Sequence, residues 1–146
     1  MFFDKPTKEL EGELLRSANV EDFIQDHQDS FLNMTLAEYI RQMISEKGLN
    51  ERDVKKASDI DKTYIHEIFK GKKKNVDRNK LLRLAFALQL DSDETQRLLT
   101  IGGRSRLYVR NERDCVILYA LDHGKTLREA EEELYQNGYD TIYDNE

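Results

Sequence analysis

The chain has few of the residues and segments that mark secreted or membrane proteins. Its 146 residues include one cysteine, one proline and no tryptophan. A single cysteine cannot form an internal disulfide, which fits a reducing compartment, and we expect Cys115 to pack in the core because it lies in an apolar run. That run, residues 115–121, is too short to cross a bilayer, and residues 1–6 do not resemble a secretory signal. These absences predict a soluble cytoplasmic protein with no membrane contact.

Signals of catalysis are also scarce. The three histidines, His27, His66 and His123, lie far apart in the sequence and lack the paired spacing of metal ligands. An apolar environment would make Cys115 an inert thiol rather than a nucleophile. The glycine pair within residues 101–104 lacks the spacing of a phosphate-binding loop. We therefore expect no enzyme activity, no metal and no cofactor.

Charge is distributed unevenly along a chain whose net charge is −6. Residues 36–90 carry 13 basic and 8 acidic side chains, a net charge of +5, whereas residues 1–35 carry −5 and residues 91–146 carry −6. A DNA-binding segment between acidic arms gives this profile, and so does ordinary scatter of surface charge. We favour the first interpretation.

Residues 49–74 have the pattern of two short helices joined by a tight turn. Asn50 can cap the first helix, in which Val54 and Ala57 are expected to face inward. The second helix is predicted to begin near Asp61 and to end at a glycine. Its core positions share one helix face: Ile65, Ile68 and Phe69.

This segment resembles the helix-turn-helix of the lambda-repressor/Cro-like family, also called the xenobiotic-response-element family of regulators. The resemblance covers about residues 36–90 and rests on apolar positions and one glycine: Leu49, Val54, Ile60, Ile65, Ile68, Phe69, Gly71, Leu81, Leu84, Ala85 and Leu88. Three positions depart from the family pattern. Asp59 stands at the turn where glycine is usual, Lys55 replaces a small residue, and Glu51 replaces a glutamine that often binds phosphate.

Capping residues predict three further helices around the motif, beginning after Thr35, Asp77 and Asp91. Together with the two helices of the motif they make five helices over residues 35–103. The resemblance implies the same number in a lambda-repressor-like DNA-binding core.

Extensions are predicted on both sides of this core. Residues 1–34 should form an acidic helical arm, which either packs on the core or tunes access to DNA; we favour packing. Residues 104–146 combine an arginine-rich connector with a C-terminal helical hairpin. Residues 115–121 fit a buried helix or a short strand, and Gly124 favours the helix. Thr126 can cap the last helix, whose apolar face is expected to be Leu127, Ala130, Leu134 and Tyr135. The fold class is therefore all-α.

The connector arginines have two interpretations. They either contact the DNA backbone or pair with acidic side chains of the same chain, such as those of residues 131–133, and we favour pairing. These arginines are Arg104, Arg106, Arg110 and Arg113.

The resemblance implies which residues would meet DNA. In this family the second helix of the motif lies in the major groove, which assigns base reading to Lys62, Thr63, Tyr64, His66 and Glu67. The lysines that follow would meet phosphates: Lys70, Lys72, Lys73 and Lys74. A solvated loop would have the same composition, and we favour the phosphate role.

Two functions stay open at this point. The first is a sequence-specific transcriptional regulator that binds double-stranded DNA through the helix-turn-helix. The second is a repressor-like adaptor or antitoxin-type protein that binds a protein partner through its acidic arms and hairpin. Glu51, Asp61 and Glu67 favour the second function, because acidic side chains on the DNA-facing surface repel phosphate.

We also expect a homodimer, because one motif reads only a few base pairs and such regulators commonly bind paired half-sites. The candidate dimer contacts are residues 115–121 and the apolar face of the last helix: Leu127, Ala130 and Leu134.

Overall fold

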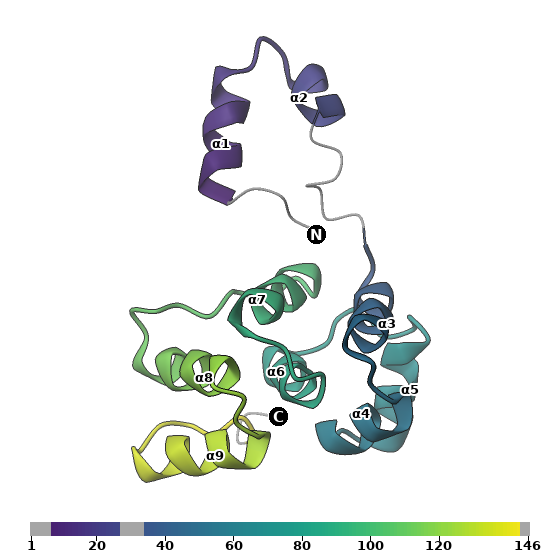
Figure 1. The fold of residues 1–146 in the computed structure, drawn as a ribbon, viewed down its shortest axis with the longest axis vertical. Helices are drawn as coiled ribbons and strands as arrows, with labels where there is room; N and C mark the ends of the chain where they lie inside the picture. Colours follow the sequence, from purple (N-terminus) through teal and green to yellow (C-terminus); the bar gives the residue numbers. More distant parts are fainter. Residues whose placement is uncertain (1–6, 27–33, 144–146) are drawn as a thin grey trace. The chain divides into compact units, whose positions relative to one another are not determined.

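A computed structural model describes residues 7–26 and 34–143 of the chain. His27 and residues 1–6, named above, lie outside the described residues. The chain divides into two compact units, residues 1–33 and residues 34–146. All regular secondary structure in the described residues is helical, so the all-α prediction is confirmed (Figure 1).

The first unit contains two short helices, α1 (Thr7–Arg16) and α2 (Val20–Asp26). Asn19 caps the start of α2: its side-chain oxygen accepts a hydrogen bond from the Asp22 amide at 2.7 Å. Phe23 is buried in this unit, whereas Leu15 is 84% exposed. The two helices therefore form a small unit of their own with some apolar side chains left open.

The second unit begins with the five predicted core helices. These are α3 (Leu36–Lys47), α4 (Glu51–Ser58), α5 (Lys62–Phe69), α6 (Arg78–Ala87) and α7 (Ser92–Ile101). Thr35 and Asp91 each form a complete capping box, and Asp77 caps α6, as predicted. The five predicted core helices are confirmed.

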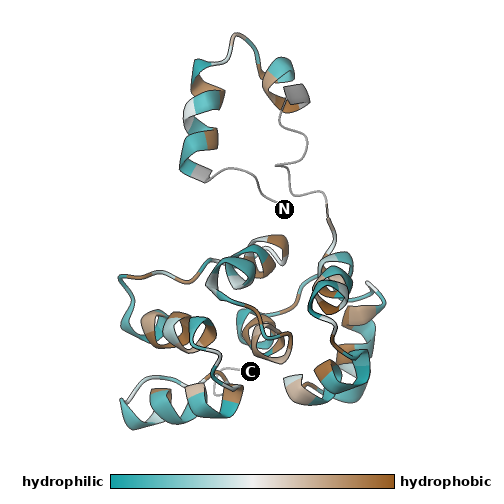
Figure 2. Ribbon diagram, in the orientation of Figure 1, coloured by the Kyte–Doolittle hydropathy of each residue, from teal (hydrophilic) through white to brown (hydrophobic). Residues whose placement is uncertain are grey.

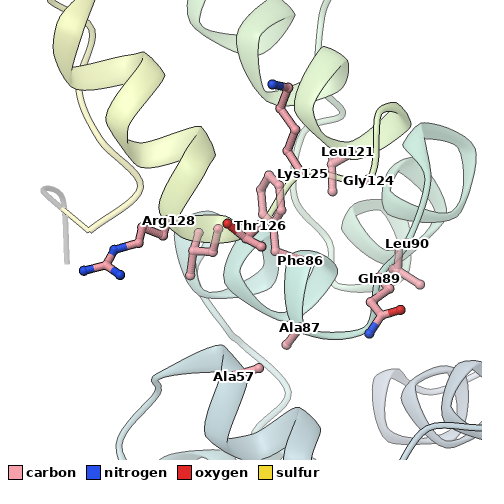
Figure 3. Close-up of a pocket in the computed structure, with 11 residues that line it drawn as sticks. Ala57, Phe86, Ala87, Gln89, Leu90, Leu121, Gly124, Lys125, Thr126 and Arg128 are labelled. Carbon is pink, nitrogen blue, oxygen red and sulfur yellow. The ribbon is translucent and has the colours of Figure 1, made fainter.

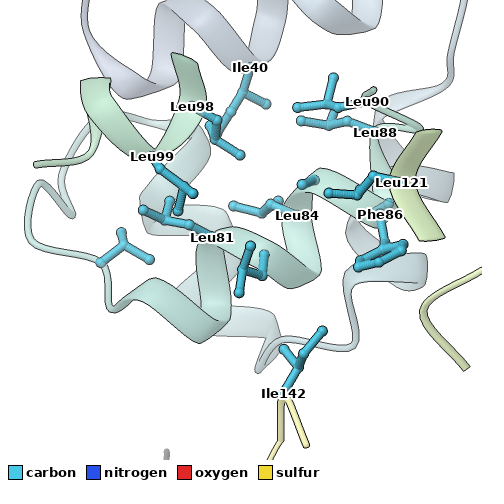
Figure 4. Close-up of a cluster of buried hydrophobic side chains, with 14 of the residues drawn as sticks. Ile40, Leu81, Leu84, Phe86, Leu88, Leu90, Leu98, Leu99, Leu121 and Ile142 are labelled. Atoms are coloured by element: carbon cyan, nitrogen blue, oxygen red, sulfur yellow. The ribbon is translucent and has the colours of Figure 1, made fainter. Parts of the chain in front are cut away.

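Helix α6 lies at the centre of this unit, between the motif helices and the later helices (Figure 1). It is buried along nearly its whole length, and Figure 2 accordingly shows it as mainly hydrophobic, in contrast to the largely hydrophilic α9. Figure 4 shows its core side chains together with those packed around them from α3, α7, α8 and the C-terminal segment: Ile40, Leu81, Leu84, Leu98, Leu99, Leu121 and Ile142.

Helices α8 (Glu112–Asp122) and α9 (Leu127–Gln136) form the predicted C-terminal hairpin. Ile117, Ala130 and Leu134 are fully buried in the same hydrophobic core as the motif. The hairpin is thus built into the second unit rather than attached to its surface.

Two predictions about apolar side chains of the hairpin were wrong. Cys115 is exposed, and Tyr135 is 78% exposed. Helix α8 is apolar around much of its circumference, but other helices cover only the side that carries Ile117 and Leu121. In α9 the buried stripe runs through residues four apart, and Tyr135 lies one residue beyond it, about 100° around the helix.

Candidate nucleic-acid interface

The motif consists of α4, a short turn and α5, and side-chain caps set both helix starts. Asn50 accepts hydrogen bonds from the amides of Arg52 at 2.9 Å and Asp53 at 3.3 Å. Asp61 accepts hydrogen bonds from the amides of Thr63 at 3.1 Å and Tyr64 at 3.2 Å. Asp59 adopts the left-handed conformation, with φ 54°, as expected at the position where the family usually has glycine. The predicted turn is confirmed.

The inward face of α4 differs from the prediction at one position. Val54 is buried as expected, but Ala57 is exposed and Ser58 is fully buried instead. Residues four apart share a helix face more closely than residues three apart do, and Ser58 can enter the core because its hydroxyl donates to the Lys55 carbonyl at 2.7 Å. The buried stripe of α4 therefore runs from Val54 into the turn.

Helix α5 has one buried face and one open face. Its core positions are at most 3% exposed: Ile65, Ile68 and Phe69. Three of the predicted base-reading residues, Lys62, Thr63 and His66, are exposed. The other two, Tyr64 and Glu67, are half-buried. Because α5 is anchored by its apolar face, its exposed side chains project from a backbone of defined position.

Tyr64 lies between two lysine side chains. The Nζ atoms of Lys73 and Lys80 are 5.0 and 5.1 Å from the centre of its ring, a cation–π distance. Lys80 also pairs with Asp77 at 3.1 Å. Sequence reasoning did not single out Lys80, although its i,i+3 spacing from the predicted cap Asp77 was visible. Tyr64 thus links α5 to the loop and the helix that follow.

We call residues 70–77, between α5 and α6, the lysine loop. Its backbone is held at both ends. At its start the amides of Lys72 and Lys73 donate to the Glu67 carbonyl, at 2.9 and 3.3 Å. At its end Arg104 donates to the Val76 carbonyl at 2.8 Å. Between these anchors Lys72 and Lys74 are exposed, as is Lys70 at the end of α5, and Lys73 is half-buried. The loop therefore presents several ammonium groups from a fixed backbone.

The three acidic residues that seemed to oppose DNA binding each have a local structural role. Glu51 pairs with Lys55 on α4 at 3.4 Å. Asp61 is the cap of α5, and Glu67 lies 4.0 Å from Lys73. Their charges are thus partly offset by neighbouring cations or helix amides, which weakens their repulsion of phosphate.

A buried arginine of α6 binds the turn between α4 and α5. Arg83 of α6 is only 4% exposed, and its guanidinium donates to the carbonyl of Ser58 at 3.2 Å and to the carbonyl of Asp59. Sequence reasoning missed this residue. The available signal was a single arginine inside the apolar run of residues 81–88.

The favoured pairing of the connector arginines with acidic side chains of the same chain, such as those of residues 131–133, was wrong for Arg104 and Arg113, which bind backbone carbonyls instead. Arg104 binds the end of the lysine loop, and Arg113 donates to the carbonyls of Asp140 at 2.7 Å and Thr141 at 3.2 Å. Arg106 and Arg110 are exposed. Uncapped backbone carbonyls near the connector attract these guanidinium groups, and Glu131 is already engaged by two backbone amides.

A groove of about 590 Å³ opens between the end of α4, the end of α6 and the α8–α9 turn (Figure 3). Phe86, Leu121 and Leu127 contribute apolar walls, and Lys125 and Arg128 add positive charge.

Within residues 7–26 and 34–143, no group of three histidine, cysteine or acidic side chains could hold a metal ion. In the same ranges, no helix has the length and apolar character needed to cross a bilayer.

Comparison with known families agrees with this geometry. Residues 39–94 match the family model of the Cro/C1-type HTH DNA-binding domain. This range runs from α3 into α7 and includes every residue predicted to contact DNA, so the suspected relationship to lambda-repressor/Cro-like regulators is confirmed. No curated protein and no solved structure shows a significant match to the chain.

Proposed function

We propose that the chain is a sequence-specific transcriptional regulator that inserts α5 into the major groove of double-stranded DNA. The observation that carries the proposal is the open face of α5, with Lys62, Thr63 and His66 exposed beside a lysine loop whose two ends are fixed. A rigid, positively charged surface binds phosphate without ordering its own backbone first, and an exposed helix start can reach base edges. This role needs no catalytic group or cofactor. In a cell without a nucleus DNA lies in the cytoplasm, so the protein would act there.

Contacts in the structure support a division of roles among the nine predicted site residues. Lys62 would donate to guanine, and Thr63 and His66 would contact neighbouring base edges. Tyr64 and Glu67 would instead organise the loop, because both lie against Lys73. The exposed loop lysines would meet phosphates as point charges: Lys70, Lys72 and Lys74.

Fluorescence-anisotropy titration of labelled duplexes at several salt concentrations tests the proposal. Lys72→Ala should weaken binding to all duplexes and reduce the salt slope by about one unit, because one fewer counterion is released. Lys62→Ala should cost about 1–3 kcal/mol on a duplex selected from a random pool and relax discrimination there. Lys125→Ala, at an exposed lysine of the α8–α9 turn, is the matched control and should leave the salt slope unchanged.

The proposal is wrong if wild-type protein shifts no duplex at about 50 mM salt, or if all three variants behave alike. In that case the adaptor function takes its place. The groove beside α4 favours this second candidate, because its apolar walls and the charges of Lys125 and Arg128 suit an acidic amphipathic segment of another protein. An Arg128→Glu change would then abolish partner binding while leaving the fold intact.

We also propose that the regulator acts as a homodimer that uses only part of the contacts expected from sequence. Ala130 and Leu134 are fully buried inside one chain and are therefore not available to a second copy. The outer face of α8, within the expected residues 115–121, and the preceding connector carry exposed apolar groups that are available to a second copy, with Tyr119 59% and Val109 70% exposed. Sedimentation should show a dimer at high micromolar concentration and a monomer for Tyr119→Glu; a monomeric wild type, with and without DNA, would exclude the dimer.

A further inference from the structure

The segment after α9, residues 139–143, is bound along its length to the hairpin. We call it the C-terminal strap. Arg113 donates to the carbonyls of two strap residues, at 2.7 and 3.2 Å. The carboxylate of Glu131 accepts hydrogen bonds from the amides of Ile142 at 2.6 Å and Tyr143 at 3.3 Å. Ile142 is fully buried in the main core (Figure 4). The strap backbone is therefore held on both sides, and its last described residue has a defined position.

That last residue reaches the turn of the helix-turn-helix. The Tyr143 hydroxyl donates to the Asp59 carboxylate at 3.2 Å, across 84 residues of sequence. The guanidinium of Arg83 lies 4.3 Å from the centre of the Tyr143 ring and donates to the Asp59 carbonyl. Asp59 is thus held through its side chain by the strap and through its backbone by α6.

This contact explains the aspartate at a position where glycine is usual. Aspartate adopts the left-handed conformation less readily than glycine does, so the substitution by itself disfavours the turn. Its carboxylate, however, provides the acceptor that Tyr143 needs, and a glycine could not. Burial and the negative charge of Asp59 raise the pKa of Tyr143 to about 12, which is the direction expected for a hydroxyl that donates to a carboxylate.

We infer that the C-terminal strap sets the geometry of the DNA-binding motif, with Tyr143 as a positioning residue for the turn between α4 and α5. The turn determines how the start of α5 is placed relative to α4, and both helices must meet the duplex together. A loosened turn would lower the fraction of molecules with α5 correctly placed. The inference concerns a segment outside the matched residues 39–94, and its effect on DNA rests on the proposed function.

The experiment uses the full chain and two measurements, one without DNA. Amide hydrogen exchange reports opening of the turn at residues 59–61, and anisotropy reports affinity for a generic duplex. Tyr143→Phe removes the hydroxyl and keeps the ring. It should speed exchange in the turn and weaken DNA binding, each by about threefold to tenfold, as expected for loss of one hydrogen bond. Exchange in α9 should stay unchanged, and Tyr135→Phe, at an exposed tyrosine of the hairpin, should change neither measurement.

A double-mutant cycle separates positioning from simple packing. In an Asp59→Gly background the acceptor is absent, so adding Tyr143→Phe should have no further effect. Asp59→Asn keeps an acceptor oxygen and tolerates the left-handed turn, so it should restore the sensitivity to Tyr143→Phe. The inference is overturned if Tyr143→Phe leaves exchange in the turn unchanged, or if its effect is the same with glycine at position 59.

The two measurements also distinguish this inference from the proposed function. Wild-type protein that binds no duplex, combined with the expected cycle in hydrogen exchange, would exclude the DNA proposal and leave the strap contact standing. Strong DNA binding, combined with additive effects of the two substitutions on hydrogen exchange, would support the DNA proposal and exclude the strap inference.

Discussion

Arg83→Met should destabilise the second unit strongly while preserving the packing volume around α6. The methionine keeps most of the aliphatic stem but cannot donate a hydrogen bond. The carbonyls of Ser58 and Asp59 would then lose their guanidinium partner in a region where the arginine itself is only 4% exposed. The turn of the motif would then be held less firmly to α6.

The magnitude follows from these contacts. A hydrogen bond from a charged donor contributes about 1.5–3 kcal/mol, and the bonds to the Ser58 and Asp59 carbonyls are lost. The contact with the Tyr143 ring adds about 0.5–1 kcal/mol, and removing the buried charge returns part of the total by abolishing its desolvation cost. We therefore expect the free energy of unfolding to fall by about 2–4 kcal/mol, with a decrease in Tm of roughly 10 °C.

Urea unfolding followed by far-ultraviolet circular dichroism measures this change. Arg52→Met is the matched control, because Arg52 is exposed on α4, and it should change the unfolding free energy by less than about 0.5 kcal/mol. An equally small effect of Arg83→Met would refute the reasoning, since it would mean that the two carbonyls find other partners without the guanidinium.

Three further outcomes are expected. Ile65→Ala should cost about 2–5 kcal/mol in urea unfolding by opening a cavity beneath α5, whereas Thr63→Ala, on the exposed face, should cost far less. The backbone hydrogen bond from Thr126 lowers the pKa of Glu129 below its usual 4.5, so its stabilising effect is present above that pH and is lost as the pH falls through the lowered pKa. The stability difference between wild type and Glu129→Gln should accordingly shrink in acid, and a constant difference from pH 3 to 7 would contradict the capping box. Cys115 should react with a thiol reagent in the folded protein, and reaction only after unfolding would show that it is buried.

The best sequence predictions concerned helix starts and the residues of α5. A cap is made by hydrogen bonds between residues two or three apart, as in Thr35 with Glu38 and Asp61 with the start of α5. The partners in such bonds are neighbours in the sequence, so the local sequence reveals them. The resemblance to a known motif then assigned candidate roles to exposed residues such as Lys62 that periodicity alone would have treated as ordinary surface.

Predictions about exposure were less successful, because exposure depends on which elements pack together. Cys115 and Ile117 belong to the same apolar run, yet one is open and the other fully buried. The positions of the helices packed against it, α7 and α9, decide which side of α8 is covered. The same reason accounts for Tyr135 and for the loss of Ala130 and Leu134 as dimer contacts.

The sequence by itself determined the helices, their caps, the turn at Asp59 and the charge of the lysine loop, because these depend on neighbouring residues and on side-chain chemistry. Tertiary structure alone decided that the hairpin shares a core with the motif, that Arg104 holds the end of the loop, and that Arg83 and Tyr143 meet at the turn. These contacts join residues 24 to 84 positions apart. No local pattern encodes them, since each exists only when the whole core has brought the distant segments within hydrogen-bonding distance.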